Sequence, residues 1–399
     1  MTSVTAVCAL LALTAGCSSS ASSGAGGSTS KSNEGRSGAS NSAGTSLTLH
    51  LGITVGETGA IASFGLPLAN GARLAIDEAN AEGGIHVDAT FCDSQYKSNL
   101  AVTCGRRLQS VNKDSVVIGG TTLEAIPLLA FNNTSDNKFV LIAGTGSANL
   151  VNQQNPLVAR YFFNVPQYMK REVTLLSQAS TTYSFKLDNI GIMASNDEAG
   201  LTWANALQSE WAKLGKPTPT IAKYNDGTTD FTSELTALLA NKPDAIGLTQ
   251  ACSISAAIIK QAQQLGFKGR FIQYVACDPA GLATYIPETA FTGSLFEASN
   301  WSIPSQQISD FMSSYKAKFN TPAIVASTYG YAETWWAIKA AEAAKSTDPA
   351  KIRAAMPEVL TESAPWNLQK ISNLQPTGEV SSKMDLAYVK APNNIVDIQ

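Results

Sequence analysis

Residues 51–85 read LGITVGETGAIASFGLPLANGARLAIDEANAEGGI. The apolar run over 47–55 ends at a glycine-containing loop, which predicts a strand. Residues 65–84 carry apolar side chains at helical spacing and end in Gly-Gly, which stops a helix. A strand, a loop and a helix in this order begin an alternating α/β arrangement.

The same alternation of strand and helix continues along the chain and then starts again. The first group of predicted elements, strands and helices in turn, is 86–93, 98–113, 115–120, 123–133 and 138–144. The second group alternates helix and strand over 171–180, 189–195, 200–215, 219–225, 230–242, 244–250, 253–266, 269–276 and 293–299. Two helices (305–320 and 327–345) and a strand-like tail (384–390) follow. The pattern predicts two α/β lobes of similar size, each a mostly parallel sheet with helices on both faces.

Composition narrows the functional classes. The 399 residues are 44% hydrophobic and 15% charged, which suits a globular protein of two domains. The net charge of -3 and the lack of a basic stripe argue against nucleic-acid binding. With only His50 and His86, no GxSxG elbow and no HExxH helix, we expect no enzyme, no metal site and no cofactor.

The N-terminus has the features of an export signal. Residues 4–15 are apolar and uncharged, but too few to span a bilayer. The sequence that ends at Cys17 resembles the lipobox of bacterial lipoproteins, although Thr14 stands where that motif usually has Leu. We expect a signal peptide over 1–16, a lipid on Cys17, and a disordered Ser/Gly tether over 17–46 that reaches about 30 Å. An ordinary secretory signal is the alternative.

Four cysteines belong to the expected folded body. An even number in an exported protein suggests two disulfides, and four cysteines allow three connectivities. Local pairing is the simplest choice: Cys92 with Cys104, and Cys252 with Cys277.

An ordered set of motifs carries a family resemblance. It comprises residues 51–85 and FCDSQYKSNLAVTCGRRL (91–108), IGGTTLEAIPL (118–128), TTDFTSELTALLANKPDAI (228–246), IIKQAQQLGF (258–267) and FMSSYKAKFNTPA (311–323). The chain after residue 47 resembles the branched-chain amino-acid-type (Leu/Ile/Val-binding-like) substrate-binding proteins of ABC importers. The resemblance implies a type I periplasmic-binding fold, in which two lobes close around a solute.

The resemblance also implies a domain layout. Three crossings between the lobes are expected near 164–167, 297–301 and 358–364. Lobe one then comprises 47–165 with 300–358, and lobe two comprises 166–299 with 359–399.

Loops of lobe one are the first candidates for the binding site. Ligands of open parallel sheets lie beyond the C-terminal strand ends. By resemblance, two loops hold the polar head of the ligand, and Phe64 supplies an apolar wall. The residues in these loops are Gly120, Thr121, Thr122, Thr145 and Ser147. Capping and turn chemistry is the alternative role for the polar residues among them, and core packing is the alternative for Phe64.

Lobe two departs from the amino-acid binders that it resembles. Those proteins tend to carry an aromatic residue where Ala199 stands and an acid, for the α-ammonium, near Ala276. Asp197, Glu198 or Asp278 could substitute, and Gln250 and Tyr274 are further polar candidates; solvated loop acids or helix caps are the alternative roles for the three acids. An amino acid, an amide or a carboxylate therefore all stay open as the ligand.

The sequence thus predicts a monomeric, extracytoplasmic lipoprotein that is anchored to the cell membrane and delivers a small polar solute, such as an amino acid, to an ABC permease. A ligand-sensing receptor subunit of the same fold, signalling to a membrane partner, is the alternative.

Overall fold

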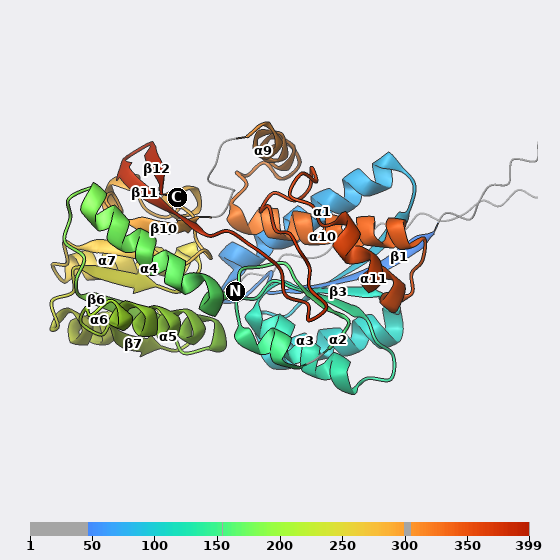
Figure 1. The fold of residues 1–399 in the computed structure, drawn as a ribbon, viewed down its shortest axis with the longest axis horizontal. Helices are drawn as coiled ribbons and strands as arrows, with labels where there is room; N and C mark the ends of the chain where they lie inside the picture. Colours follow the sequence, from blue (N-terminus) through green and yellow to red (C-terminus); the bar gives the residue numbers. More distant parts are fainter. Residues whose placement is uncertain (1–46, 154, 299–304, 399) are drawn as a thin grey trace, which may run out of the picture. The chain divides into compact units, whose positions relative to one another are not determined.

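The computed structural model describes residues 47–153, 155–298 and 305–398 (Figure 1). The expected signal peptide, Cys17, the tether and part of the expected second crossing lie outside these residues. No helix in the described part of the chain is long and apolar enough to span a membrane.

The first sheet has five parallel strands in the order β2-β1-β3-β4-β5. The five strands are β1 (Thr48–Val55), β2 (His86–Asp93), β3 (Val116–Gly119), β4 (Val140–Ala143) and β5 (Val158–Arg160). Strands β3 and β4 are fully buried apolar runs and β1 is largely buried, as expected for a sheet covered on both faces, whereas the edge strand β2 is mostly half-buried and partly polar.

Helices cover both faces of this sheet (Figure 1). On one side lie α1 (Ala62–Glu82), α10 (Val325–Ala344) and α11 (Pro349–Val359), with α9 (Gln306–Phe319) packed on α1. On the other side lie α2 (Ser98–Arg107), which continues as the π-helical turn η1 (Leu108–Asn112), and α3 (Thr122–Thr134). A short 3-10 helix, η2 (Ala148–Gln153), precedes β5. Glycine brings α1 and α10 together, because a Cβ on Gly330 would lie 1.9 Å from the Leu68 carbonyl oxygen.

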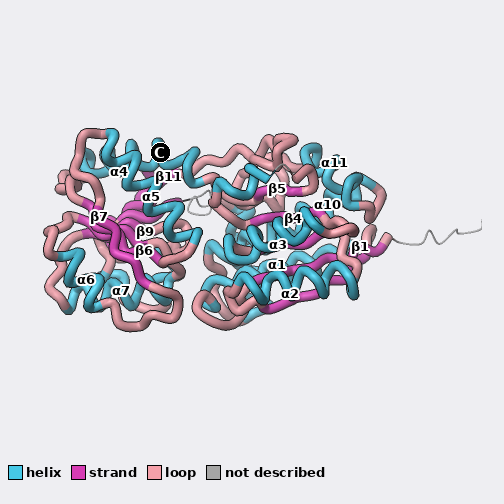
Figure 2. The backbone as a smooth tube through the Cα atoms, turned by 90° about the horizontal axis from the view of Figure 1, so that it is seen from below, coloured by secondary structure: helices cyan, strands magenta, loops and turns pink. Residues whose placement is uncertain are grey.

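The second sheet has seven strands in the order β12-β11-β10-β9-β8-β6-β7. Its parallel part is β6 (Ile190–Ser195), β7 (Thr220–Tyr224), β8 (Ala245–Leu248), β9 (Arg270–Gln273) and β10 (Leu295–Ala298), and β11 (Asp385–Ala391) and β12 (Asn394–Ile398) pair antiparallel. Figure 2 shows α4 (Val165–Thr182) and α5 (Glu198–Lys213) on one side of the strands, and α6 (Thr232–Leu239) and α7 (Cys252–Gln264) on the other. Two short helices, α8 (Pro279–Ala283) and η3 (Glu288–Ala290), join β9 to β10.

The chain passes between the two sheets at three places. The first passage follows β5, the second follows β10, and the third precedes β11. The segment after α11 first runs back along the first sheet: Tyr161 Oη donates to Asn367 Oδ1 at 2.7 Å, and the Arg160 amide donates to the Gly378 carbonyl at 2.9 Å. These bonds put the third passage after Gly378, later in the chain than the expected 358–364.

The predicted fold class is confirmed: two mostly parallel sheets, each with helices on both faces. The local disulfide pairing is present as well, since Cys92 is bonded to Cys104 and Cys252 to Cys277. The first bridge ties β2 to α2. The second ties the start of α7 to the loop after β9.

Asp114 provides a test of stability in the first lobe. Its side chain is buried, and no described residue donates a hydrogen bond to its Oδ2 atom. Burial, aided by the nearby Asp88 carboxylate, raises the pKa of Asp114 to about 7. An unfolded aspartate has a pKa of about 3.9, so the folded state binds the proton more tightly. The stability that this proton contributes is therefore lost as the pH rises from about 4 through 7.

We predict that Asp114→Asn gains thermal stability relative to the wild type as the pH is raised from 5 to 8, measured as Tm by differential scanning fluorimetry. Asp226→Asn, the same change at an exposed loop position, is the control and should show no such gain. A Tm difference between Asp114→Asn and wild type that is equal at both pH values would contradict the prediction.

Candidate functional site

A cavity lies where the C-terminal ends of strands from both sheets meet. It encloses about 460 Å³ of space free of protein atoms, its open mouth included. Loops after all five strands of the first sheet contribute to its lining, and so do loops after β6, β8 and β9 of the second. The lining residues are Ile61, Phe64, Tyr96, Thr121, Thr122, Gly144, Gly146, Phe162, Ala199, Thr249, Gln250, Ala251, Tyr274 and Ala276.

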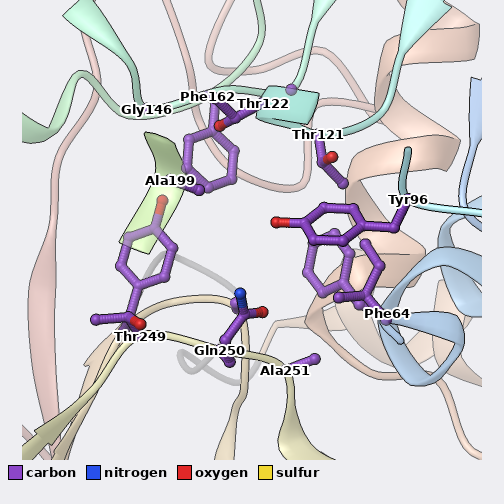
Figure 3. Close-up of a pocket in the computed structure, with 14 residues that line it drawn as sticks. Phe64, Tyr96, Thr121, Thr122, Gly146, Phe162, Ala199, Thr249, Gln250 and Ala251 are labelled. Carbon is purple, nitrogen blue, oxygen red and sulfur yellow. The ribbon is translucent and has the colours of Figure 1, made fainter. Parts of the chain in front are cut away.

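Aromatic rings form much of the cavity wall. Figure 3 shows the rings of Phe64, Tyr96 and Phe162 around the cavity, with the Tyr96 hydroxyl pointing into it. The centroids of the Phe162 and Tyr274 rings are 6.5 Å apart, so the two lobes contact each other through aromatic side chains here. Such rings provide apolar contact area with few degrees of freedom to lose on binding.

None of the fourteen lining residues carries a charged side chain. The polar side chains that line the cavity are neutral, namely Thr121, Thr122, Thr249, Gln250 and the two tyrosines. Among the described residues, no group of His, Cys, Asp or Glu is arranged to hold a metal ion.

The N-terminus of α3 faces this cavity. Thr121 is the N-cap residue, but its side chain makes no capping hydrogen bond. The buried Glu124 carboxyl of the first turn bonds the Thr121 and Glu124 amides instead, so the amides between them are the ones left for another acceptor. The buried Thr122 hydroxyl lies 2.7 Å from that of Thr145, which joins the loops after β3 and β4. The partial positive charge of the helix N-terminus favours an anionic group at this position.

Arg160 holds the loop after β4 from behind. Its fully buried guanidinium donates to the carbonyl oxygens of Thr145 and Ser147 and pairs with Glu379 at 2.8 Å. The Val165 amide donates to the carbonyl of Gly146 at 3.2 Å. The carbonyl oxygens of Thr145, Gly146 and Ser147 therefore all accept hydrogen bonds, on the side where the chain first passes between the lobes.

Hydrogen bonds close the cavity between the lobes. The hydroxyls of Ser63 and Ser253 lie 2.8 Å apart. Glu198 of α5 accepts from the Ser147 hydroxyl and, at 2.8 Å, from Asn149 Nδ2. The structure is thus a closed form.

Two buried carboxyls lie behind the lobe-two wall. Glu297 accepts from the Val275 amide at 3.0 Å and from Tyr168 Oη and Trp203 Nε1. Burial and the neighbouring Glu297 raise the pKa of Glu172 well above its usual value, and burial also raises the pKa of Glu297. This pair supports the wall from behind and is not among the lining residues.

The structure brings five of the predicted site residues to the cavity: Phe64, Thr121, Thr122, Gln250 and Tyr274. Gly120, Thr145 and Ser147 belong to the loops that carry the lining. Asp197 and Glu198 lie at the lobe boundary, where they bond to side chains of lobe one. Asp278 has a different position: it caps α8 through the Gly281 amide and accepts from the Val325 amide at 2.8 Å.

Sequence reasoning missed Tyr96 and Phe162. Both follow strand ends, β2 and β5, as the other lining residues do. The predicted strand at 86–93 carried the signal for Tyr96, because a loop at the C-terminal end of a parallel strand faces the ligand. The three-residue β5 lacked a recognisable strand pattern, so Phe162 had no such signal.

Arg160 offers a test of how this site is held. Arg160→Met should lower the free energy of unfolding by about 3–5 kcal/mol, because it leaves the Glu379 carboxylate buried without its cation. Chemical denaturation measures this loss. Lys186→Met, which breaks an exposed pair with Asp244, is the control and should cost less than about 1 kcal/mol. Similar losses in both variants would contradict the structural role of Arg160.

Comparisons with known proteins agree with this architecture. A family model described as periplasmic binding protein matches residues 48–394. A leucine-binding protein of Thermotoga maritima is similar in structure, with a TM-score of 0.75 and 20% identity over 88% of this chain and 97% of that one. A branched-chain amino acid transporter substrate-binding protein of Streptococcus pneumoniae, in complex with isoleucine, has a TM-score of 0.75 and 17% identity over 88% and 99%. A solute-binding protein of an R. palustris ABC transporter, in complex with benzoate, has a TM-score of 0.73 and 15% identity over 88% and 95%. At these identities, the likeness to the solved structures shows the fold.

Proposed function

The chain belongs to the periplasmic binding protein family, and on this basis we propose that it captures a small organic carboxylate or amide between its lobes and delivers it to an ABC importer. Members of this family are solute-binding proteins rather than enzymes and work outside the cytoplasm. The observation that carries the proposal is the closed, aromatic-walled cavity without charged lining residues.

The polar head of the ligand is assigned to the lobe-one side of the cavity. The N-terminus of α3 and the linked hydroxyls of Thr122 and Thr145 supply hydrogen-bond donors there. Arg160, paired with Glu379, holds the loop after β4 in place from behind. Donors of this kind suit a carboxylate, which accepts several hydrogen bonds.

The lobe-two side argues against an ordinary α-amino acid. Ala199 and Ala276 line the cavity at the positions where, by the family resemblance, amino-acid binders tend to carry an aromatic residue and an acid. An α-ammonium group in the usual orientation would lose its water without gaining a carboxylate partner. Aromatic or aliphatic acids and amides therefore fit this wall better.

The membrane attachment is also part of the proposal. A lipid on Cys17, after removal of residues 1–16, would keep the binding lobes near a permease in the same membrane. A Ser/Gly tether over 17–46 would allow them to reach it.

Calorimetric titration of the purified chain with a panel of small carboxylates and amides tests the proposal. We predict one site per chain and no chemical turnover of the bound compound. Thr122→Val should weaken binding by about 0.5–1.5 kcal/mol, because it removes one hydroxyl from the polar head site.

Thr174→Val, the same change on an exposed face of α4, is the matched control and should leave affinity unchanged. No binding across the panel, or equal affinity in Thr122→Val and wild type, would contradict the assignment.

A further inference from the structure

One corner of the cavity is formed by the polar side chains of Tyr96, Thr121 and Gln250. Figure 3 shows the Tyr96 hydroxyl and the Gln250 amide turned into the cavity, with Thr121 beside them. We call these three residues the acceptor corner. Each of them gives a hydrogen to a carboxyl group that lies behind the lining.

Glu124 takes the hydrogen of Thr121. Glu124 is fully buried in the first turn of α3, and its two carboxyl oxygens accept from the hydroxyls of Thr121 and Ser94. Ser94 Oγ in turn accepts from the Tyr96 amide at 3.1 Å. Burial raises the pKa of Glu124, while the two hydroxyl bonds favour its charged form. Because the Thr121 hydroxyl donates to Glu124, the lone pairs of its oxygen stay available.

Asp197 takes hydrogens from the other two residues. Its Oδ2 atom accepts from Tyr96 Oη at 3.3 Å and from Gln250 Nε2 at 3.1 Å, while Oδ1 accepts from the Gly200 amide at 2.8 Å. Burial and the Asp197 and Glu124 charges raise the pKa of Tyr96 well above its usual value, so the phenol keeps its proton. Because Gln250 turns its NH₂ group to Asp197, its carbonyl oxygen is the polar atom left for a ligand.

The backbone of Gln250 is itself fixed. Its carbonyl oxygen accepts from Gln273 Nε2 at 3.0 Å and from Ser255 Oγ at 3.1 Å, both of which are buried. In the closed form, the acceptor corner is therefore held by bonds from both lobes.

We propose that the ligand carries, apart from its carboxylate, a neutral hydrogen-bond donor group (a hydroxyl or amide group) that binds the acceptor corner of Tyr96, Thr121 and Gln250. This inference rests on the proposed function and names the class of solute: a small acid with a separate donor. The hydroxyl oxygens of Tyr96 and Thr121, whose hydrogens are already donated, and the amide oxygen of Gln250 can accept from such a group. An apolar atom in its place would leave these oxygens without a partner.

The test uses pairs of acids that differ only in a donor group, titrated by calorimetry into the full purified chain. One pair is benzoate and 4-hydroxybenzoate, and the other is 3-phenylpropanoate and 3-(4-hydroxyphenyl)propanoate. We expect the wild type to prefer the donor-bearing acid of at least one pair by about threefold to tenfold, the factor for one hydrogen bond.

Variants of the corner separate recognition from support of the fold. Tyr96→Phe and Gln250→Leu should bring the affinity ratio within the preferred pair close to one, while the plain acid keeps most of its affinity. Tyr285→Phe, which removes a hydroxyl from an exposed ring, is the matched control and should leave the ratio unchanged. A merely structural role would weaken both acids equally and preserve the ratio.

The outcomes are distinguishable. If benzoate or 3-phenylpropanoate binds but the donor-bearing partner gains nothing in either pair, the inference is overturned while the proposed function stands. A preference that survives both corner substitutions also overturns it. If no acid of either pair binds, we take the assignment of a small acid, and with it this inference, to be wrong.

Discussion

The buried guanidinium of Arg160 is the interaction on which the site depends. It lies at the end of β5, where the chain first leaves the five-stranded sheet. From there it holds the carbonyls of the loop after β4 and pairs with Glu379. The second oxygen of Glu379 accepts from Asn164 Nδ2 at 2.7 Å, so the same carboxylate also holds the first passage between the lobes. Without this cation, a buried carboxylate and two carbonyls would lose their partner together.

The charged side chains near the cavity are not among the residues that line it. Its lining is neutral and largely aromatic, while Arg160, Glu124 and Asp197 bond to the lining from behind. In this arrangement each charge is satisfied by protein groups in the closed form. The charged groups do not line the cavity. They act by fixing the direction in which hydroxyl, amide and backbone groups of the lining donate or accept hydrogen bonds. Specificity can then come from donor and acceptor geometry without an unpaired charge in the empty cavity.

The fold could be predicted from the sequence because its signal is local. Helical and strand periodicity predicted the alternation that builds both sheets, and the short spacing of the cysteines favoured the pairing that the structure has. The strand-end loops likewise led to Thr121, Thr122 and Gln250, since parallel strands bring their C-terminal ends to one edge.

The rest of the site depends on contacts between distant segments. Tyr96 becomes a lining residue through Asp197, on the other lobe, and Arg160 acquires its role through Glu379. From its place after a strand in the sequence, Asp278 was a candidate to bind the ligand. In the structure its carboxylate instead caps α8 and accepts from the Val325 amide. The third passage between the lobes comes later in the chain than expected, because Asn367 and Gly378 bond to residues at the end of β5. No periodicity in the sequence indicates these bonds.

A crystal structure of the chain with a bound small acid would test the central claim most directly. The account predicts that the carboxylate lies at the N-terminus of α3, beside Thr122 and the loop after β4, with its body between the rings of Phe64 and Phe162. Electron density for the acid outside this cavity, or with its carboxylate against Tyr96 and Gln250, would contradict it.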